Sequence, residues 1–205
     1  MKSVADIPFY FWDKVLPDEA CDLIIQQGLA LDNFKSAGVN SDNTKDPNLR
    51  QGSIAWFSKE SQVDALLKSY VNTANIQAKW NYVINQSEQV QFSIYGLQSK
   101  YGWHRDTNVK LEEGVPIRKL SVSVQLSHAD DYEGGNFEIK NFFGHKLNNN
   151  EKELRNRGTI IVFPSFLEHQ VTPVTKGTRY SLVQWYSGPD WRWGMKAVIS
   201  DRIYL

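Results

Sequence analysis

A histidine and an aspartate separated by one residue lie in the stretch YGWHRDT, residues 101–107. On an extended backbone, side chains two residues apart point the same way, so His104 and Asp106 would project together. The stretch FPSFLEHQVTP supplies a third candidate, His169, just after an expected strand. Two imidazoles and one carboxylate on one face of an octahedral metal leave three positions open, as in non-haem iron(II) oxygenases. We therefore predict that these three residues bind a divalent metal.

An H-x-D pair alone is weak, because a surface ion pair or a hydrogen bond at a strand end explains most occurrences. The prediction gains weight from Arg179, ten residues after His169. The residues 175–177 between them are typical of a hairpin turn, after which the chain would return antiparallel with Arg179 and Ser181 on one face. A guanidinium and a hydroxyl there would suit the far carboxylate of a dicarboxylate whose other end binds the metal.

Two expected strands beside the metal-binding segment, 88–96 and 119–126, each have one polar and one apolar face. Such faces usually lie at the solvent-exposed surface of an antiparallel sheet. Because both strands flank the metal-binding segment, we expect their polar faces to line a cavity instead, with Tyr95 the best-placed hydroxyl to bind the far carboxylate of the dicarboxylate. The polar residues are Gln91, Ser93, Tyr95, Ser121, Ser123 and Gln125.

Helices precede strands in the expected order of elements. A strand at 7–13 leads to a helix from Pro17 to about Leu29, whose buried face we assign to Leu23, Ile24, Ile25 and Leu29. A strand at 53–57 and a helix from 61 to about 76 follow. Alternating β-branched and aromatic residues then predict strands at 88–96, 119–126, 135–140, 159–164 and 179–186. This order predicts an α+β, mainly β protein: a sandwich or barrel with helices packed on one face.

The length of 205 residues suits one domain. We expect a support region at 1–87, a catalytic core at 88–189 and a C-terminal segment at 190–205. Within the core, the polar segment 144–157 is expected to be a mobile surface loop.

Composition narrows the function classes. Lys plus Arg and Asp plus Glu both number 23, and this neutral balance disfavours a nucleic-acid partner. The single cysteine, Cys21, excludes an intramolecular disulfide and a cysteine-based zinc site, and we expect it to be buried. The sequence has no recognisable signal peptide and no stretch typical of a membrane span, so the expected location is cytoplasmic.

Three stretches, FSIYGLQSKYGWHRDT, LSVSVQLSHADDYEGGNFEI and GTIIVFPSFLEHQVTPVTKGTRYSLVQWYSGP, resemble the prolyl 4-hydroxylase-like iron(II)/2-oxoglutarate dioxygenases. They cover residues 91 to about 189. The resemblance implies a double-stranded β-helix (jelly-roll, cupin-like) core with supporting N-terminal helices. It also implies iron(II), 2-oxoglutarate and O2 as cofactor and co-substrates, with ascorbate as a candidate reductant.

The same resemblance implies roles for single residues. His104, Asp106 and His169 would be the iron ligands and catalytic residues. Arg179 would pair with the C5 carboxylate of 2-oxoglutarate. The remaining candidates for co-substrate binding are Ser181, which completes an R-x-S pattern, Tyr95, which matches a strand tyrosine of prolyl hydroxylases, and Gln125, which stands where some relatives carry another tyrosine.

The implied reaction hydroxylates a substrate while 2-oxoglutarate and O2 become succinate and CO2. A prolyl residue in a peptide or protein is the leading substrate, and Trp103, Trp185, Trp191 and Trp193 could line its groove. A small molecule, another side chain or a nucleobase are the alternatives, the last disfavoured by the neutral charge.

Two other classes of protein remain open. A non-catalytic metal-binding jelly-roll module would not need Arg179. A zinc hydrolase would need a general base near the metal, and Glu168 should point the opposite way from His169. His128 and His145 are alternative ligands in principle and are expected to be solvated.

Overall fold

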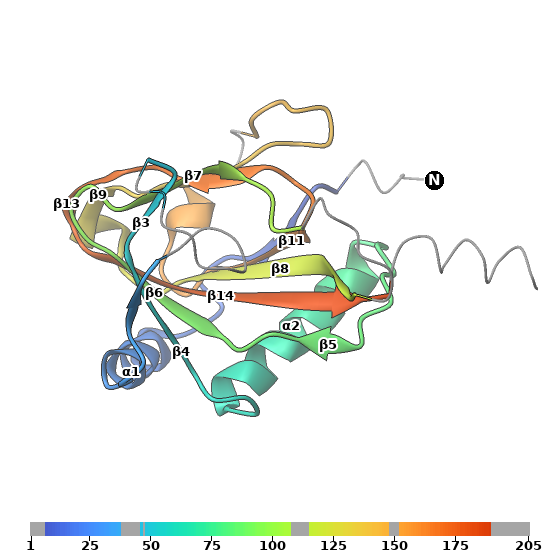
Figure 1. Cartoon of the computed structure of the whole chain (residues 1–205), viewed down its shortest axis with the longest axis horizontal. Helices are drawn as coiled ribbons and strands as arrows, with labels where there is room; N and C mark the ends of the chain where they lie inside the picture. The colour runs from blue at the N-terminus through green and yellow to red at the C-terminus, as the bar shows by residue number, and fades with distance from the viewer. Residues whose placement is uncertain (1–6, 38–45, 47, 108–114, 148–151, 190–205) are drawn as a thin grey trace, which may run out of the picture.

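The computed structural model describes residues 7–37, 46, 48–107, 115–147 and 152–189. Trp191, Trp193 and the rest of the expected segment 190–205 lie outside these residues, as do 148–151 of the expected surface loop. No helix among the described residues is long and apolar enough to cross a membrane. The described elements are two α-helices, two 3-10 turns and a set of antiparallel strands that form a jelly roll (Figure 1).

The main sheet crosses the middle of the molecule in Figure 1. Its strands are antiparallel, and β5 (Gln86–Ser87) pairs with the outer part of one of them, β14. In spatial order the others are β1 (Tyr10–Trp12), β11 (Ile160–Pro164), β8 (Ile117–Gln125), β14 (Arg179–Gly188), β6 (Gln91–Tyr95), β4 (Ser53–Trp56) and β2 (Lys35–Ser36). The N-terminal support region therefore adds strands to both edges of the core sheet.

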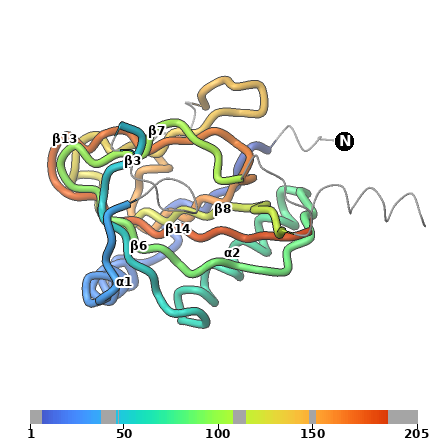
Figure 2. Tube along the Cα trace, viewed as in Figure 1, coloured from blue at the N-terminus to red at the C-terminus, as the bar shows by residue number. Residues whose placement is uncertain are grey.

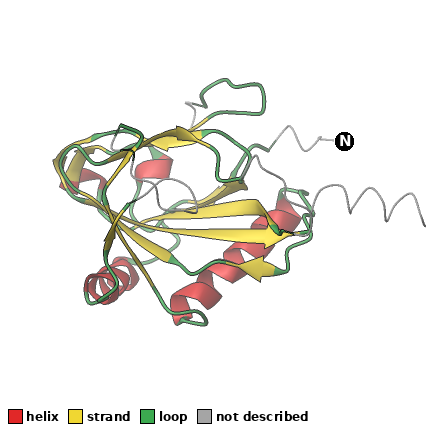
Figure 3. Ribbon diagram, viewed as in Figure 1, coloured by secondary structure: helices red, strands yellow, loops and turns green. Residues whose placement is uncertain are grey.

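Both α-helices, α1 (Asp18–Leu29) and α2 (Gln62–Gln77), lie on one side of the main sheet (Figure 3). α2 begins where the Ser61 hydroxyl accepts a hydrogen bond from the backbone N–H of Asp64, and α1 carries acidic residues in its first turn. The sheet face beneath them is apolar because alternate residues of each strand point to the same side. Those packed in this core include Phe92, Leu120, Val122, Val124, Ile160, Val162 and Leu182.

A smaller sheet faces the other side of the main sheet (Figure 1). Its strands are β10 (Phe137–Ile139), β12 (His169–Val171), β7 (Lys100–His104) and β3 (Arg50–Gln51). Figure 2 shows β3 beside β7, although fifty residues of chain separate them. A second apolar core, including Phe137, Ile139, Ile161 and Phe163, joins the two sheets at one end. The expected jelly-roll fold with N-terminal helices on one face is confirmed.

The buried face of α1 differs from the expected one. Ile24 is buried as predicted, but Leu23 and Leu29 are 51% and 48% exposed. The helix packs along a narrow stripe of Cys21, Ile24 and Gly28. A Cβ on Gly28 would lie 2.7 Å from the Phe92 ring, so the helix lies close to the sheet along this stripe. Assigning every leucine of the helix to the core was wrong, whereas burial of Cys21 is confirmed.

One loop prediction is also wrong, and a second holds only in part. Residues 175–177 form no hairpin turn. They belong to strand β13 (Val174–Gly177), which pairs with β9 (Tyr132–Gly134). Strand β14 then pairs with β6 and β8 instead of β12.

The described part of 144–157 is not simply a loose loop. It includes a 3-10 turn, η3 (Glu153–Arg155), whose Leu154 is buried and whose Arg155 donates hydrogen bonds to backbone oxygens of 129, 132 and 134.

Candidate functional site

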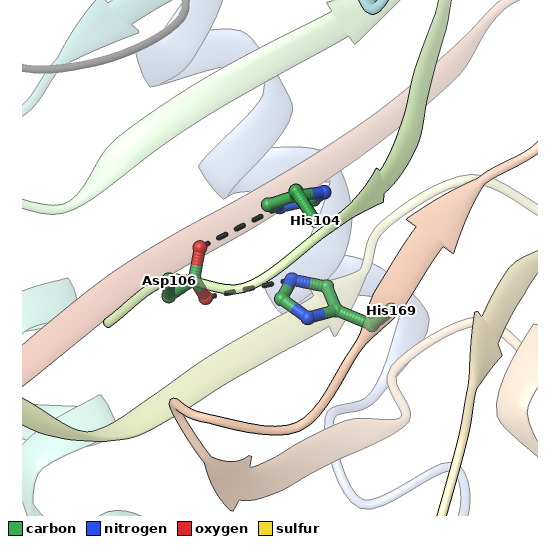
Figure 4. Close-up of side chains that lie close together, drawn as sticks. All are labelled: His104, Asp106 and His169. Carbon is green, nitrogen blue, oxygen red and sulfur yellow. Dashed lines mark ion pairs between the residues drawn. The ribbon is translucent and has the colours of Figure 1, made fainter. Parts of the chain in front are cut away.

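His104, Asp106 and His169 converge between the two sheets, as Figure 4 shows. The Nε2 atom of His104 lies 3.5 Å from Oδ1 of Asp106, and the Nε2 atom of His169 lies 3.4 Å from Oδ2. One potential ligand atom from each residue lies within 4.8 Å of the other two. The predicted set of three side chains is therefore brought together, close enough for one small cation to contact all three.

Strand pairing produces this convergence. His104 ends β7 and His169 begins β12, and the two residues are direct partners across the antiparallel pair. Asp106 follows β7, where its backbone N–H and that of Thr107 donate to the carbonyl oxygen of Ser165 at 2.9 and 3.1 Å. The segments before His169 and after His104 are thus tied to each other, which aims both imidazoles and the carboxylate at one point.

Each imidazole is oriented by the backbone two residues before it. Nδ1 of His104 lies 2.8 Å from the carbonyl oxygen of Gly102, and Nδ1 of His169 lies 3.0 Å from that of Leu167. A carbonyl oxygen can only accept, so both Nδ1 atoms carry the proton. Both Nε2 atoms then present a lone pair to the site, as a metal ligand must.

The carboxylate is held in its ionised form. Ser121 Oγ donates to Oδ2 of Asp106 at 2.7 Å. Burial, the strongest influence, would raise the pKa of Asp106, but His169, His104 and Arg118 together outweigh it and hold that pKa well below its usual range. Burial lowers the pKa of His169 to about 4, against the opposing pull of Asp106. Near neutral pH the site thus offers an anionic carboxylate and a neutral His169, the protonation states that metal binding needs.

Arg179 lies in the main sheet at the first position of β14, beside Tyr95 of β6. Its side chain is 1% exposed, with the guanidinium carbon 5.2 Å from the centre of the Tyr95 ring. Its hydrogen-bond partners are neutral: Nε and Nη2 donate to Oε1 of Gln125, and Nη1 donates to Oγ of Ser181. No described acid forms an ion pair with it. A buried cation without an anionic partner is costly and indicates a site for an anionic ligand.

One cavity contains both the histidine–aspartate cluster and Arg179. The predicted residues that line it are Tyr95, His104, Asp106, His169, Arg179, Ser181, Gln91, Ser123 and Trp185. The polar faces of β6 and β8 therefore turn inward, as expected, and all six of their polar residues are buried. Gln125 does not line this cavity. Its side chain accepts hydrogen bonds from Arg179 and borders a second cavity.

Sequence reasoning missed Arg50 and Tyr101, which also line the cavity. The Tyr101 ring stacks on His104 with centroids 3.4 Å apart, and burial raises its pKa to about 12. The Arg50 guanidinium carbon lies 4.5 Å from the centre of the Tyr101 ring. The aromatic residue three positions before His104 was a usable signal for Tyr101. Nothing local marks Arg50, because only the pairing of β3 with β7 brings it here.

The remaining candidates lie away from the cluster. His128 and His145 are exposed, as expected. Glu168 points away from the metal ligands and pairs with Lys140 at 2.8 Å and Arg105 at 3.6 Å. Trp103 does not line the cavity, and the Lys140 ammonium lies 4.3 Å from the centre of its ring.

Residues 90–187 match the family described as the 2OG-Fe(II) oxygenase superfamily. A PKHD-type hydroxylase of Alteromonas mediterranea is 35% identical over 97 residues, 46% of this chain and 41% of the relative. A PKHD-type hydroxylase of Delftia acidovorans is 34% identical over 98 residues, with the same coverages. The chain thus spans about two fifths of the length of these relatives.

Solved structures share the fold at low sequence identity. A Pseudomonas putida prolyl-4-hydroxylase superposes with a TM-score of 0.67 at 16% identity, covering 91% of this chain and 96% of the other. A Trichoplax adhaerens prolyl hydroxylase, solved with a hypoxia inducible factor peptide fragment, gives a TM-score of 0.65 at 19% identity, covering 88% and 83%. These likenesses show a common double-stranded β-helix fold.

Proposed function

We propose that the chain is an iron(II)- and 2-oxoglutarate-dependent dioxygenase that hydroxylates its substrate, because residues 90–187 match the 2OG-Fe(II) oxygenase superfamily and a similar stretch is 35% identical to a PKHD-type hydroxylase. The proposal assigns iron binding to His104, Asp106 and His169. It assigns the distal carboxylate of 2-oxoglutarate to Arg179, with Ser181 and Tyr95 beside it. Within the single domain, residues 88–189 would form the catalytic core.

The observation that carries the proposal is the buried, unpaired guanidinium of Arg179 in the same cavity as the ligand cluster. A metal-binding module without co-substrate would gain nothing from this charge, which is expensive to bury. A dicarboxylate that spans the cavity explains both features, because one end meets the cation and the other meets the guanidinium. The donor set also fits iron(II): two imidazole nitrogens and one carboxylate suit this ion and leave positions open.

When bound, iron(II) with 2-oxoglutarate and O2 supplies the oxidative decarboxylation and hydroxylation chemistry, with release of succinate and CO2. The carbonyls of Gly102 and Leu167 keep both imidazoles in the ligand tautomer, and Ser121 keeps the Asp106 carboxylate aimed at the cation. Phe137, Phe163 and Val171 add apolar walls to the same cavity, which would limit the access of water to the reacting groups.

We propose a prolyl residue in a peptide or protein as the substrate. The PKHD-type and prolyl hydroxylase relatives support this choice, and one of those structures holds a peptide fragment. Trp185, which lines the cavity while its ring packs against the Arg118 guanidinium at 4.1 Å, offers a rigid apolar wall for a prolyl ring. A free small molecule or another side chain is the alternative substrate.

The experiment that tests the chemistry is anaerobic addition of iron(II) and 2-oxoglutarate to the purified protein. We expect a visible metal-to-ligand charge-transfer band that needs both additions. Folded protein that binds iron(II) but gives no band with 2-oxoglutarate would contradict the assignment. Succinate formation with a panel of proline-containing peptides, each paired with the same peptide carrying alanine for proline, then tests the substrate.

A further inference from the structure

Gln125 contacts the guanidinium of Arg179 without lining the cavity that holds the candidate metal ligands. Gln125 ends β8, and Arg179 begins the neighbouring strand, β14. The amide oxygen Oε1 accepts from Nε at 3.1 Å and from Nη2 at 2.8 Å. Both side chains are almost fully buried, at 2% and 1% exposure. This contact is therefore a fixed part of the interior rather than a transient surface bond.

The contact determines which donors of Arg179 remain for a ligand. A guanidinium has five N–H donors. Gln125 takes one from Nε and one from Nη2, and Ser181 takes one from Nη1 at 3.2 Å. Two donors are left, one on each terminal nitrogen. Two donors on adjacent nitrogens match the two oxygens of a single carboxylate, the bidentate pairing that guanidinium groups favour.

The orientation of the Gln125 amide is itself forced. Its NH2 group cannot face the N–H donors of Arg179, so Oε1 must. The other end of the amide, Nε2, is then buried without a hydrogen-bond partner in the described part of the chain. A buried donor without a partner lowers stability, and few such donors occur in native proteins. The two hydrogen bonds from Arg179 to Oε1 determine this orientation of the amide.

A neutral acceptor also preserves the charge of Arg179. A carboxylate at position 125 would form a buried ion pair with the guanidinium and compete with any anionic ligand. The glutamine amide restrains the same atoms without neutralising them. We propose that Gln125 is a positioning residue that holds Arg179 in one orientation with its charge unpaired, and thereby makes the site selective for 2-oxo acids that carry a second carboxylate. This inference rests on the proposed function and extends it.

The test compares two ligands in calorimetric titrations of the protein loaded with manganese(II), a metal chosen to replace iron(II) so that binding is measured without turnover. One is 2-oxoglutarate, and the other is 2-oxopentanoate, which has the same carbon chain but lacks the distal carboxylate. Gln125→Glu keeps the size and shape of the side chain and introduces the competing charge. Gln125→Met keeps the length and removes the acceptor without adding a charge.

We expect Gln125→Glu to weaken 2-oxoglutarate binding by about ten- to a hundredfold, the range of a charge-assisted hydrogen bond, while 2-oxopentanoate changes by less than about threefold. Gln125→Met should lower the preference for 2-oxoglutarate by a smaller factor, because the guanidinium stays charged but loses its restraint. A residue that only supports the fold would weaken both ligands together, so the ratio of the two affinities separates positioning from stability.

The outcomes are distinguishable from failure of the proposed function. If the wild-type protein binds 2-oxoglutarate no better than 2-oxopentanoate, the dicarboxylate assignment itself fails. If the wild-type protein prefers 2-oxoglutarate and folded Gln125→Glu keeps that preference, only the role of Gln125 is overturned. An equal loss of both ligands in Gln125→Glu would also overturn it.

Discussion

Replacing Arg179 by methionine tests the binding of the distal carboxylate most directly. Methionine keeps a long unbranched side chain at a position that is 1% exposed, and removes the charge and every donor. Gln125 and Ser181 occupy three of the five guanidinium donors, so two remain for the ligand. Each hydrogen bond to a charged group contributes about 1.5–3 kcal/mol.

Two such bonds amount to at least about 3 kcal/mol, and each 1.4 kcal/mol corresponds to a tenfold change in affinity. We therefore expect Arg179→Met to weaken 2-oxoglutarate binding by about a hundredfold or more. Binding of the metal should be unchanged, because none of the hydrogen bonds of Arg179 involves His104, Asp106 or His169. Arg179→Lys keeps the charge but loses the planar arrangement of donors, so its affinity for 2-oxoglutarate should lie between those of the wild-type protein and Arg179→Met.

The assay is calorimetric titration of manganese(II)-loaded protein with 2-oxoglutarate, preceded by titration of the metal into the metal-free protein. Circular dichroism and thermal unfolding show whether each variant is folded. A folded Arg179→Met protein that binds 2-oxoglutarate within about threefold of wild type would refute the reasoning, as would loss of the metal with co-substrate affinity retained.

Three further predictions concern Ser121, His169 and Leu154. Ser121→Ala removes the hydrogen bond to Oδ2 of Asp106, and should weaken metal binding by about 10–100-fold in a competitive chelator titration; unchanged affinity would mean that the hydroxyl does not orient the carboxylate. The pKa of His169 falls from 6.5 to about 4 on folding, so the unfolded chain binds more protons between those values. The free energy of unfolding of metal-free protein should therefore decrease as the pH falls through this window, by at most about 3 kcal/mol from this residue. Urea unfolding from pH 7 to pH 4.5 measures this, and His169→Gln should show a smaller decrease; equal decreases in both proteins would argue against a buried neutral imidazole. Leu154→Ala should lower the free energy of unfolding by about 2–5 kcal/mol, because Leu154 is 4% exposed in the second core; a change below 1 kcal/mol would restore the view of this segment as a loose loop.

Much of the fold could be predicted from the sequence alone, because the alternation of side chains along a strand is a local property. The alternation in 119–126 places Leu120, Val122 and Val124 on the helix side and Ser121 and Ser123 on the cavity side, and the structure has this arrangement. The same period of two put His104 and Asp106 on one side of the chain. The Ser61 cap and the acidic first turn of α1 are equally local signals, and both helices begin where these signals lie.

The sequence did not predict the pairing between distant segments, because nothing within a strand specifies which strand pairs with it. The Lys–Gly sequence at 176–177 is typical of a hairpin turn, but its backbone pairs with β9, and that partner lies more than forty residues earlier. Arg50 reaches the cavity only because β3 pairs with β7. Leu23 and Leu29 are exposed because tertiary packing turns the face of α1 that holds Cys21, Ile24 and Gly28 toward the sheet.

The types of residue in the candidate site were therefore readable from the sequence, and their environment was not. Sequence spacing pointed to a metal ligand set and an arginine for a dicarboxylate. Only the tertiary structure decided that the arginine is buried, that its described partners are neutral, and that Gln125 holds it from outside the cavity. The physical reason is that burial and hydrogen-bond partners depend on which strands lie side by side, whereas the direction of a side chain along one strand depends on that strand alone.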